Sequence, residues 1–235
     1  MGGPAVFGKV LIANRGEIAL RVARTCRELG IATVAVYSTV DRDSAVVRYA
    51  DEAVQIGPGP ARRSYLSMPA ILEAARRTRA DAIHPGYGFL SENPYFAEAC
   101  TASGFTFVGP PAEVIAKLGD KIAARELLAK AGVPVLPGSQ RPLATPAEAK
   151  AVVAEIGLPV IIKAAAGGGG RGMAVVTTAA ELEPTFREVR ANAQALFSDS
   201  RVYIERLLDP ARHVEVQILA DGHGSVLHLG ERDCS

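Results

Sequence analysis

Residues 159–176 read Pro-Val-Ile-Ile-Lys-Ala-Ala-Ala-Gly-Gly-Gly-Gly-Arg-Gly-Met-Ala-Val-Val. An apolar run ends in Lys163, a loop almost without side chains follows, and a second apolar run begins at Met173. Each glycine in such a run costs about 0.5–1 kcal/mol of stability relative to alanine, because it loses more backbone entropy on folding. A chain tolerates this cost where backbone N–H groups must approach a ligand closely, and polyphosphate is a common ligand of such loops. We interpret residues 164–172 as a nucleotide-phosphate loop between two strands, called the glycine flap below.

Other phosphate-binding loops fit this stretch less well. Gly167, Gly169 and Gly172 have the spacing of a dinucleotide fingerprint, but that fingerprint requires a helix after the loop, whereas a valine-rich strand is expected here. A Walker A loop would close with Gly-Lys-Ser/Thr, and in protein kinases the lysine follows the glycine loop instead of preceding it. A flexible linker between domains is the remaining alternative, although linkers seldom separate two apolar runs of this kind.

Composition is that of an ordinary globular protein. The 235 residues are 49% apolar and 22% charged, and the net charge of +1 favours neither nucleic acid nor an anionic membrane as a partner. We find no transmembrane-length apolar run, signal peptide or myristoylation pattern. Cys26, Cys100 and Cys234 are widely spaced and odd in number, which favours the cytoplasm, and no metal-type Cys/His spacing occurs. Cys26 shares a helical apolar pattern with its neighbours, so we expect it in the core.

The first half of the chain alternates predicted strands and helices, which is typical of an α/β domain with a parallel sheet. We expect strands at 9–13, 32–37, 53–56, 82–84 and 105–108, and helices at 16–29, 69–79 and 94–103, the last capped within 91–93. This first domain covers residues 1–110. A helical connector over 111–134 follows, with Ile122, Leu127 and Leu128 on one face of a helix at 120–130.

The second half contains a different unit. Residues 135–208 combine the glycine flap with predicted helices at 147–156 and 180–196. After this unit, predicted strands at 213–220 and 225–230 flank an Asp-Gly-His-Gly turn, which is typical of a hairpin. Residues 209–235 therefore begin a further half-domain. The last residues show no cap and no polar tail, so we expect the natural polypeptide to continue beyond Ser235.

Three charged residues are candidates for nucleotide contacts. Lys163 ends an apolar strand, and a charge in that position must face something polar. Lys121 could bind phosphate as a point charge, although taken alone an exposed helix lysine is the simpler interpretation. Glu205 ends a second apolar strand and could accept a hydrogen bond from an adenine amino group, but a surface salt bridge with Arg206 is the simpler alternative.

Two further segments stay open at this stage. Residues 84–93 (His-Pro-Gly-Tyr-Gly-Phe-Leu-Ser-Glu-Asn) follow a predicted strand, at the end of a parallel sheet that faces the ligand crevice, and a tight turn with a hydrogen-bonded histidine is an equal alternative. Strand alternation places His213, Glu215 and Gln217 on one face, which either lines a site or faces water. His223 is expected to be a turn residue.

Taken together, these segments resemble one family closely. The sequence is similar to biotin carboxylases of the ATP-grasp superfamily in Lys9–Ala19, His84–Asn93, Gly119–Lys121, Lys163 with the glycine flap, Arg212–Glu215 and Glu231–Ser235. The motifs follow the family order across essentially the whole chain. The resemblance implies a Rossmann-like N-terminal domain with a parallel sheet, followed by a partial ATP-grasp domain that contains its α+β lid and the first hairpin of its catalytic half.

The resemblance also implies a function and a set of roles. Members of the family use Mg-ATP and bicarbonate to carboxylate carrier-bound biotin for acyl-CoA or pyruvate carboxylases. Their partners are a biotin carboxyl carrier and a carboxyltransferase, and they form homodimers through a helix that would here carry Arg21, Arg24 and Glu28. ATP-binding positions carried over to this sequence are Lys121, Lys163, Gly169, Gly170, Glu205, Arg206, Leu207, Leu208 and His213. This match, not the spacing, favours binding roles for Lys121 and Glu205.

The sequence departs from the family pattern in three ways. Ala166 replaces a glycine that is common in the flap, and Leu207 replaces a common aromatic residue. The metal-binding glutamates, the catalytic residues and the bicarbonate site of the family lie beyond Ser235, so we assign no catalytic residue and no Mg²⁺ ligand here and expect the fragment alone to be inactive. Alternatives are a different ATP-grasp ligase, or a non-catalytic nucleotide-binding or dimerisation module. The sequence does not identify the final carboxyl acceptor.

Overall fold

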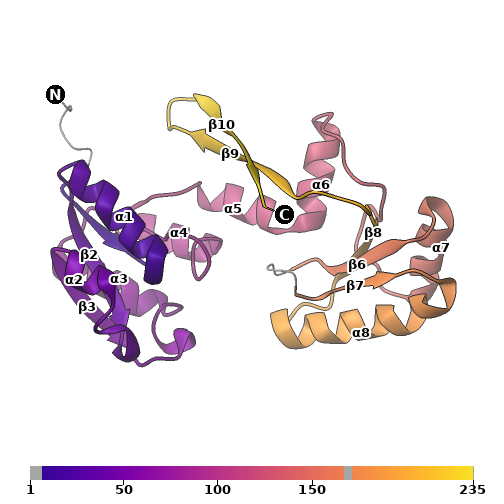
Figure 1. Cartoon of the computed structure of the whole chain (residues 1–235), viewed down its shortest axis with the longest axis horizontal. Helices are drawn as coiled ribbons and strands as arrows, with labels where there is room; N and C mark the ends of the chain where they lie inside the picture. Colours follow the sequence, from indigo (N-terminus) through magenta and orange to yellow (C-terminus); the bar gives the residue numbers. More distant parts are fainter. Residues whose placement is uncertain (1–6, 167–170, 235) are drawn as a thin grey trace. The chain divides into compact units, whose positions relative to one another are not determined.

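The computed structural model describes residues 7–166 and 171–234, and the chain divides into two compact units at Ala124/Arg125. The strands of the first unit are β1 (Lys9–Ile12), β2 (Ala32–Ser38), β3 (Glu52–Gly57), β4 (Ala82–His84) and β5 (Thr106–Phe107) (Figure 1). Its helices are α1 (Gly16–Glu28), α2 (Ala45–Tyr49), α3 (Met68–Thr78), α4 (Pro94–Ala102) and α5 (Ala112–Gly119), with short 3-10 turns η1 (Thr39–Asp41) and η2 (Ala61–Arg63). Helix α6 (Lys121–Lys130) crosses the division.

The first unit is built on a parallel sheet, as predicted, and its strand order is β3-β2-β1-β4-β5. Successive residues of β1 enter opposite cores: Leu11 packs with residues of α3 and α4, whereas Val10 and Ile12 pack with residues of α1 and α2. Burial on both faces explains why the central strands are apolar throughout instead of alternating. Cys26 of α1 is buried in the second of these cores, which confirms its predicted role, and burial raises the pKa of its thiol.

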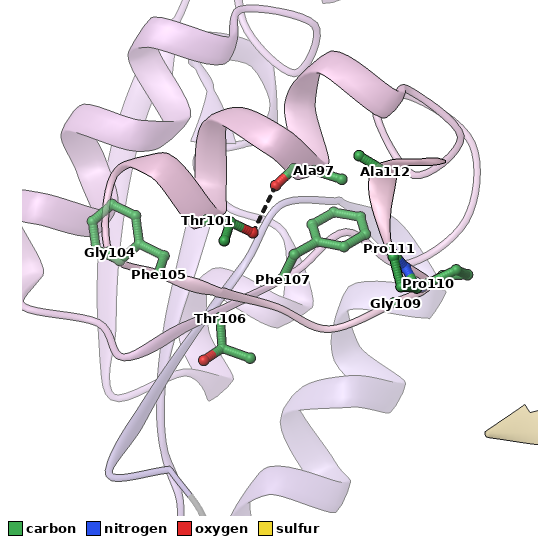
Figure 2. Close-up of a pocket in the computed structure, with 10 residues that line it drawn as sticks. All are labelled: Ala97, Thr101, Gly104, Phe105, Thr106, Phe107, Gly109, Pro110, Pro111 and Ala112. Atoms are coloured by element: carbon green, nitrogen blue, oxygen red, sulfur yellow. Dashed lines mark hydrogen bonds between the residues drawn. The ribbon is translucent and has the colours of Figure 1, made fainter. Parts of the chain in front are cut away.

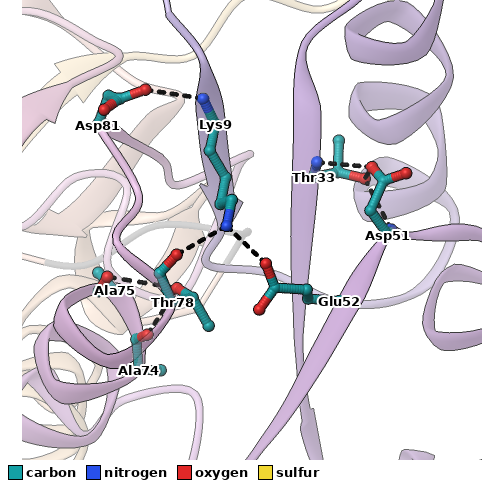
Figure 3. A network of polar contacts seen from close by, with 8 residues as sticks. All are labelled: Lys9, Thr33, Asp51, Glu52, Ala74, Ala75, Thr78 and Asp81. Atoms are coloured by element: carbon teal, nitrogen blue, oxygen red, sulfur yellow. Dashed lines mark hydrogen bonds and ion pairs between the residues drawn. The ribbon is translucent and has the colours of Figure 1, made fainter.

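A polar network ties the amino ends of the strands together (Figure 3). The Lys9 ammonium donates to Glu52 of β3 at 2.6 Å and to the carbonyl oxygen of Thr78, at the end of α3, at 2.8 Å. The Lys9 backbone N–H donates to Asp81 at 2.7 Å. One lysine therefore joins the edge strand, the central strand and the α3–β4 connection.

The second unit contains a smaller antiparallel sheet of β6 (Val160–Ala164), β7 (Met173–Val176) and β8 (Val202–Arg206), in the order β7-β6-β8. Helices α7 (Pro146–Ile156) and α8 (Ala179–Phe197) pack on one face of it, and Phe186 lies fully buried between them and the sheet. Both helices begin with a capping box, Thr145 with Glu148 and Thr178 with Glu181. The hairpin of β9 (Val214–Ala220) and β10 (Val226–Asp233) forms a separate two-stranded sheet, as expected.

Several local expectations required correction. Strand β5 is shorter than predicted, and α2 and the two 3-10 turns were not predicted because short segments carry little periodicity. The connector predicted to be helical contains α5 as well as α6. In α6 Ile122 is buried, but Leu127 and Leu128 are 50% and 40% exposed, so the apolar stripe of this helix is not a core face in this structure. Among residues 7–166 and 171–234, no helix has the length and hydrophobicity needed to cross a membrane.

A buried tyrosine organises the carboxyl end of β2. The Tyr65 hydroxyl donates to Asp41 at 2.7 Å and accepts from the Ser38 N–H, and the Ser38 hydroxyl and the Arg15 guanidinium also donate to Asp41. Burial alone would raise the pKa of Asp41, but the hydrogen bonds from Ser38, Tyr65 and Arg15 together hold it below its usual value. Burial and the Asp41 carboxylate raise the pKa of Tyr65 to about 12.

The lowered pKa of Asp41 predicts an acid-sensitive contribution to the stability of the first unit. The contribution is complete above the pKa of an unfolded aspartate, about 3.9, and is lost as pH falls below it. At pH 7 the free energy of urea unfolding of the wild-type protein should therefore exceed that of the Asp41→Asn variant. The difference between the two proteins should shrink towards pH 2. Asp43→Asn, an exposed neighbour, serves as the control. A difference that stays constant with pH would contradict the prediction.

Candidate functional site

The small sheet of the second unit has one face covered by helices and one face that carries charge. Along β6, Val160, Ile162 and Ala164 are buried against α7 and α8, so strand alternation turns Ile161 and Lys163 to the other side. Cross-strand pairing adds neighbours to that side. We call it the outer face, and its residues are Ile161, Lys163, Met173, Val175, Tyr203 and Glu205.

The outer face brings together two predicted site residues, Lys163 and Glu205. The Lys163 ammonium lies 2.6 Å from Oε2 of Glu205, and the Arg125 guanidinium of α6 pairs with Oε1 of the same carboxylate. Glu205 is buried, with 7% of its side chain exposed, whereas the side chains of Lys163 and Arg125 are 30% and 18% exposed. A buried carboxylate needs such partners, because an unpaired charge in the protein interior is strongly destabilising.

The simpler sequence interpretation of Glu205, a surface salt bridge with Arg206, is wrong. Arg206 points to the opposite side of β8 and donates through Nη1 to the carbonyl oxygen of Ile156 at 2.6 Å. Adjacent residues of a strand project to opposite faces, so their side chains cannot pair in an extended backbone. After β8 the chain stays close to the sheet, because the Leu207 N–H donates to the carbonyl oxygen of Pro159 at 3.0 Å. The next residue, Leu208, is 54% exposed.

Tyr203 lies beside Glu205 on the outer face and contributes no charge at neutral pH. It is 3% exposed, and burial, followed by the neighbouring Glu205 carboxylate, raises the pKa of its hydroxyl to about 12. The charged groups at this place are therefore two cations, Lys163 of the outer face and Arg125 of α6, and one carboxylate, that of Glu205. Ile161 and the half-exposed Met173 and Val175 add an apolar surface next to these charges.

The outer edge of β8 is closed by a short extended segment. The Arg206 N–H donates to the carbonyl oxygen of Pro137 at 2.8 Å, and the Ser139 N–H donates to that of Ile204 at 2.8 Å. Gly138 bridges to Glu205, and a Cβ atom on Gly138 would lie 2.3 Å from the Ile204 carbonyl oxygen. Only glycine permits this approach, so Gly138 helps to fix the strand that carries Glu205.

The remaining predicted site residues lie elsewhere. Lys121 belongs to the first unit, where it begins α6 and is half-buried, directly after Asp120, which accepts hydrogen bonds from the N–H groups of the first turn. His213 is exposed just before β9, and its carbonyl oxygen accepts from the Cys234 N–H at 2.7 Å. Gly169 and Gly170 lie outside the described residues.

The predicted turn at residues 84–93 is a hydrogen-bonded structure in the first unit. The Gly86 N–H donates to Nδ1 of His84 at 3.0 Å, and burial lowers the pKa of this histidine. The Asn14 side chain, which is buried, donates to the carbonyl oxygens of Pro85 and Tyr87 at 2.7 and 2.8 Å. The structural alternative for His84, a tight turn with a hydrogen-bonded histidine, is therefore confirmed.

Sequence reasoning missed several residues of the outer face. Ile161 and Tyr203 each precede a predicted site residue by two positions, so strand alternation alone could have placed them beside Lys163 and Glu205. Arg125 follows Lys121 by four positions, which indicates a shared helix face. Its pairing with Glu205, 80 residues away, had no signal in the sequence.

One cavity of the first unit offers no comparable chemistry. A pocket of about 500 Å³ lies between α4, β5 and the start of α5 in the first unit (Figure 2), and threonines supply its only polar side chains. It therefore lacks the cations that a phosphate site requires. Within the part of the chain that the structure describes, no group of three or more His, Cys, Asp or Glu side chains could hold a metal ion.

Comparisons with known proteins give one consistent result. Residues 6–115 match the family "Biotin carboxylase, N-terminal domain", and residues 120–235 match "Carbamoyl-phosphate synthase L chain, ATP binding domain". The chain is 58% identical to the biotin carboxylase of Pseudomonas aeruginosa over 228 residues, which are 97% of this chain and 51% of that protein. The chain thus spans about half the length of the curated relatives it matches.

Solved structures agree with the sequence matches. A biotin carboxylase–β-γ-ATP complex from Campylobacter jejuni has a TM-score of 0.95 and 48% identity, covering 97% of this chain and 51% of that one. The biotin carboxylase domain dimer of Hydrogenobacter thermophilus 2-oxoglutarate carboxylase, in complex with MgADP, ADP and bicarbonate, has a TM-score of 0.94 and 46% identity, covering 97% and 50%. Both cover the two units described above.

The close approach at Gly138 predicts a large effect for one methyl group. Gly138→Ala should lower the free energy of unfolding of the second unit by about 1–3 kcal/mol, because the new Cβ must displace backbone instead of a flexible side chain. Gly222→Ala, in the hairpin turn where a Cβ would meet nothing within 4 Å, should change it by less than about 0.5 kcal/mol. Urea denaturation of both variants measures the difference, and equal effects would contradict it.

Proposed function

This chain belongs to the biotin carboxylase family, and we propose that it provides the ATP-binding part of an enzyme that uses ATP and bicarbonate to carboxylate carrier-bound biotin. The observation that carries the proposal is the outer face, where Lys163 and Glu205 meet beside an apolar surface at the end of β6, from which the glycine flap departs. A nucleotide needs these three elements: cations for the phosphates, an acceptor for the adenine amino group and an apolar surface for the ring.

The proposal assigns a role to each predicted site residue. Lys163 and Lys121 would contact phosphate oxygens, and Gly169 and Gly170 would cover them with backbone N–H groups. Glu205 would accept from the adenine amino group, since each carboxylate oxygen keeps a second lone pair beside its cation. The backbone of Arg206, Leu207 and Leu208 would contact the edge of the ring, and His213 would lie beside the nucleotide.

We propose Mg²⁺ as the metal that accompanies ATP, where it would neutralise phosphate charge. The resemblance to the family implies that its protein ligands lie beyond Ser235, and we propose no Mg²⁺ ligand among the residues of this chain. In this proposal the chain itself binds and orients ATP, and it contributes no group that attacks bicarbonate or biotin.

Partners and domain limits follow from the same proposal. A biotin carboxyl carrier and a carboxyltransferase would supply biotin and receive its carboxyl group, in the cytoplasm. A second copy of the protein would pack against α1, which carries Arg21, Arg24 and Glu28. The domains would be 1–110 (N-terminal), 111–134 (connector), 135–208 (ATP-grasp lid) and 209–235 (start of the catalytic half).

A second candidate deserves a direct comparison, because the family that matches residues 120–235 is described as the ATP-binding domain of carbamoyl-phosphate synthase. The match of residues 6–115 to the N-terminal domain of biotin carboxylases favours the first candidate. In the full-length protein we expect bicarbonate-dependent ATP hydrolysis to rise with added free biotin and not with ammonia. Stimulation by ammonia alone would reverse the assignment.

The proposed role of Lys163 predicts a specific loss of nucleotide binding. Lys163→Ala should weaken MgATP binding, measured by calorimetry, by about tenfold or more, because a charge-assisted contact to phosphate is lost. Glu205 keeps Arg125 as a partner in this variant, so the fold should persist. Lys150→Ala, which removes an exposed lysine paired with Glu183 on the helical side of the unit, is the matched control and should bind MgATP as the wild type does.

A further inference from the structure

The two cations that hold Glu205 are not equivalent. The Arg125 guanidinium pairs with Glu205 through Nη1 and also donates through Nη2 to the carbonyl oxygen of Leu136, so it is fixed at two points. The Lys163 ammonium is more exposed, and among the described residues its hydrogen-bond partner is Glu205 alone. A planar guanidinium held by two acceptors is rigid, whereas an ammonium on a four-carbon stem moves easily between acceptors.

The charge balance around Glu205 gives this difference a consequence. Lys163 and Arg125 face one carboxylate, and the Tyr203 hydroxyl beside them stays neutral, so the outer face together with Arg125 carries one positive charge in excess. If Lys163 turned towards an anion, Glu205 would still be paired with Arg125. Without Arg125, the same movement would leave a buried carboxylate without a counter-ion, which is strongly unfavourable.

We propose that Arg125 is a positioning residue that serves as the permanent counter-ion of Glu205 and so releases Lys163 to bind a nucleotide phosphate. This inference rests on the proposed function and deepens it, because it states how one lysine serves both the empty and the occupied site. The exchange moves no proton and breaks no covalent bond. The Lys163 ammonium leaves one oxygen anion for another, and Arg125 keeps Glu205 oriented beside the adenine position.

The proposal separates phosphate binding from adenine binding, which a purely structural role for Arg125 would not do. In Arg125→Met, Lys163 stays on Glu205, and the affinity for MgATP should fall by about tenfold or more, because a charge-assisted contact is lost. The affinity for adenosine, which has no phosphate, should change by no more than about twofold. Calorimetric titration of the full-length protein with MgATP and with adenosine gives the ratio of the two dissociation constants, which is the decisive quantity.

Three further variants control this measurement. Arg187→Met removes an exposed arginine of α8 that pairs with Glu183 and should leave the ratio unchanged. Arg125→Lys keeps the charge and should restore part of the wild-type ratio. In Arg125→Met/Glu205→Gln no buried carboxylate remains to hold Lys163, so the ratio should return towards that of the wild type. This double variant also answers the question if Arg125→Met alone does not fold.

The outcomes distinguish this inference from the function on which it rests. A wild-type protein that gains no affinity from the phosphates of MgATP would refute the proposed nucleotide site, and this inference with it. Wild-type binding with an unchanged ratio in Arg125→Met would overturn only the inference. The inference would also be overturned if Arg125→Met lost affinity for MgATP and for adenosine equally and the double variant did not restore it. Arg125 would then have a purely structural role.

Discussion

The second unit is organised around a buried carboxylate. Glu205 lies on β8, Lys163 on β6 and Arg125 on α6. Both ion pairs of Glu205 therefore form only when these three elements pack together in the correct relative positions. Loss of either cation would weaken the neutralisation of a group that burial strongly penalises. The close backbone approach at Gly138 keeps β8 in the position that this pairing needs.

In the first unit a buried polar side chain, that of Asn14, bonds to the protein's own backbone. Open α/β sheets bind ligands at the carboxyl ends of their strands, where the strand order reverses. Here that point lies between β1 and β4, and the Asn14 side chain fills it by donating to the carbonyl oxygens of Pro85 and Tyr87. A Cβ on Gly86 would lie 2.8 Å from the Asn14 amide nitrogen, so the loop closes tightly around it. The protein itself therefore occupies the space that a ligand uses in many open α/β sheets, and the outer face that carries Lys163 and Glu205 lies on the second unit.

Apolar periodicity predicted the long elements well. The strands and helices of the first unit and the hairpin at residues 214–233 follow from apolar runs, glycine and proline stops and the cap at Asn93, whose side chain accepts from the Phe96 N–H. Elements of a few residues, such as α2 and η1, were missed because they contain too few positions to show a period. The apolar face of α6 was visible in the sequence, but whether it is buried depends on what packs against it, and periodicity does not contain that information.

The candidate site shows the same division more sharply. The sequence by itself determined that Lys163 ends an apolar run shortly before four glycines and that Glu205 ends another apolar run, because these are local patterns of residue type. Only the tertiary structure decided that the two side chains meet at 2.6 Å, that Arg206 turns away from Glu205, and that Arg125 completes the pair from 80 residues away. Strand pairing and helix packing bring residues together that are far apart in the sequence. The free energy that selects one such pairing comes from burial and charge neutralisation over the whole unit, and no short stretch of chain contains it.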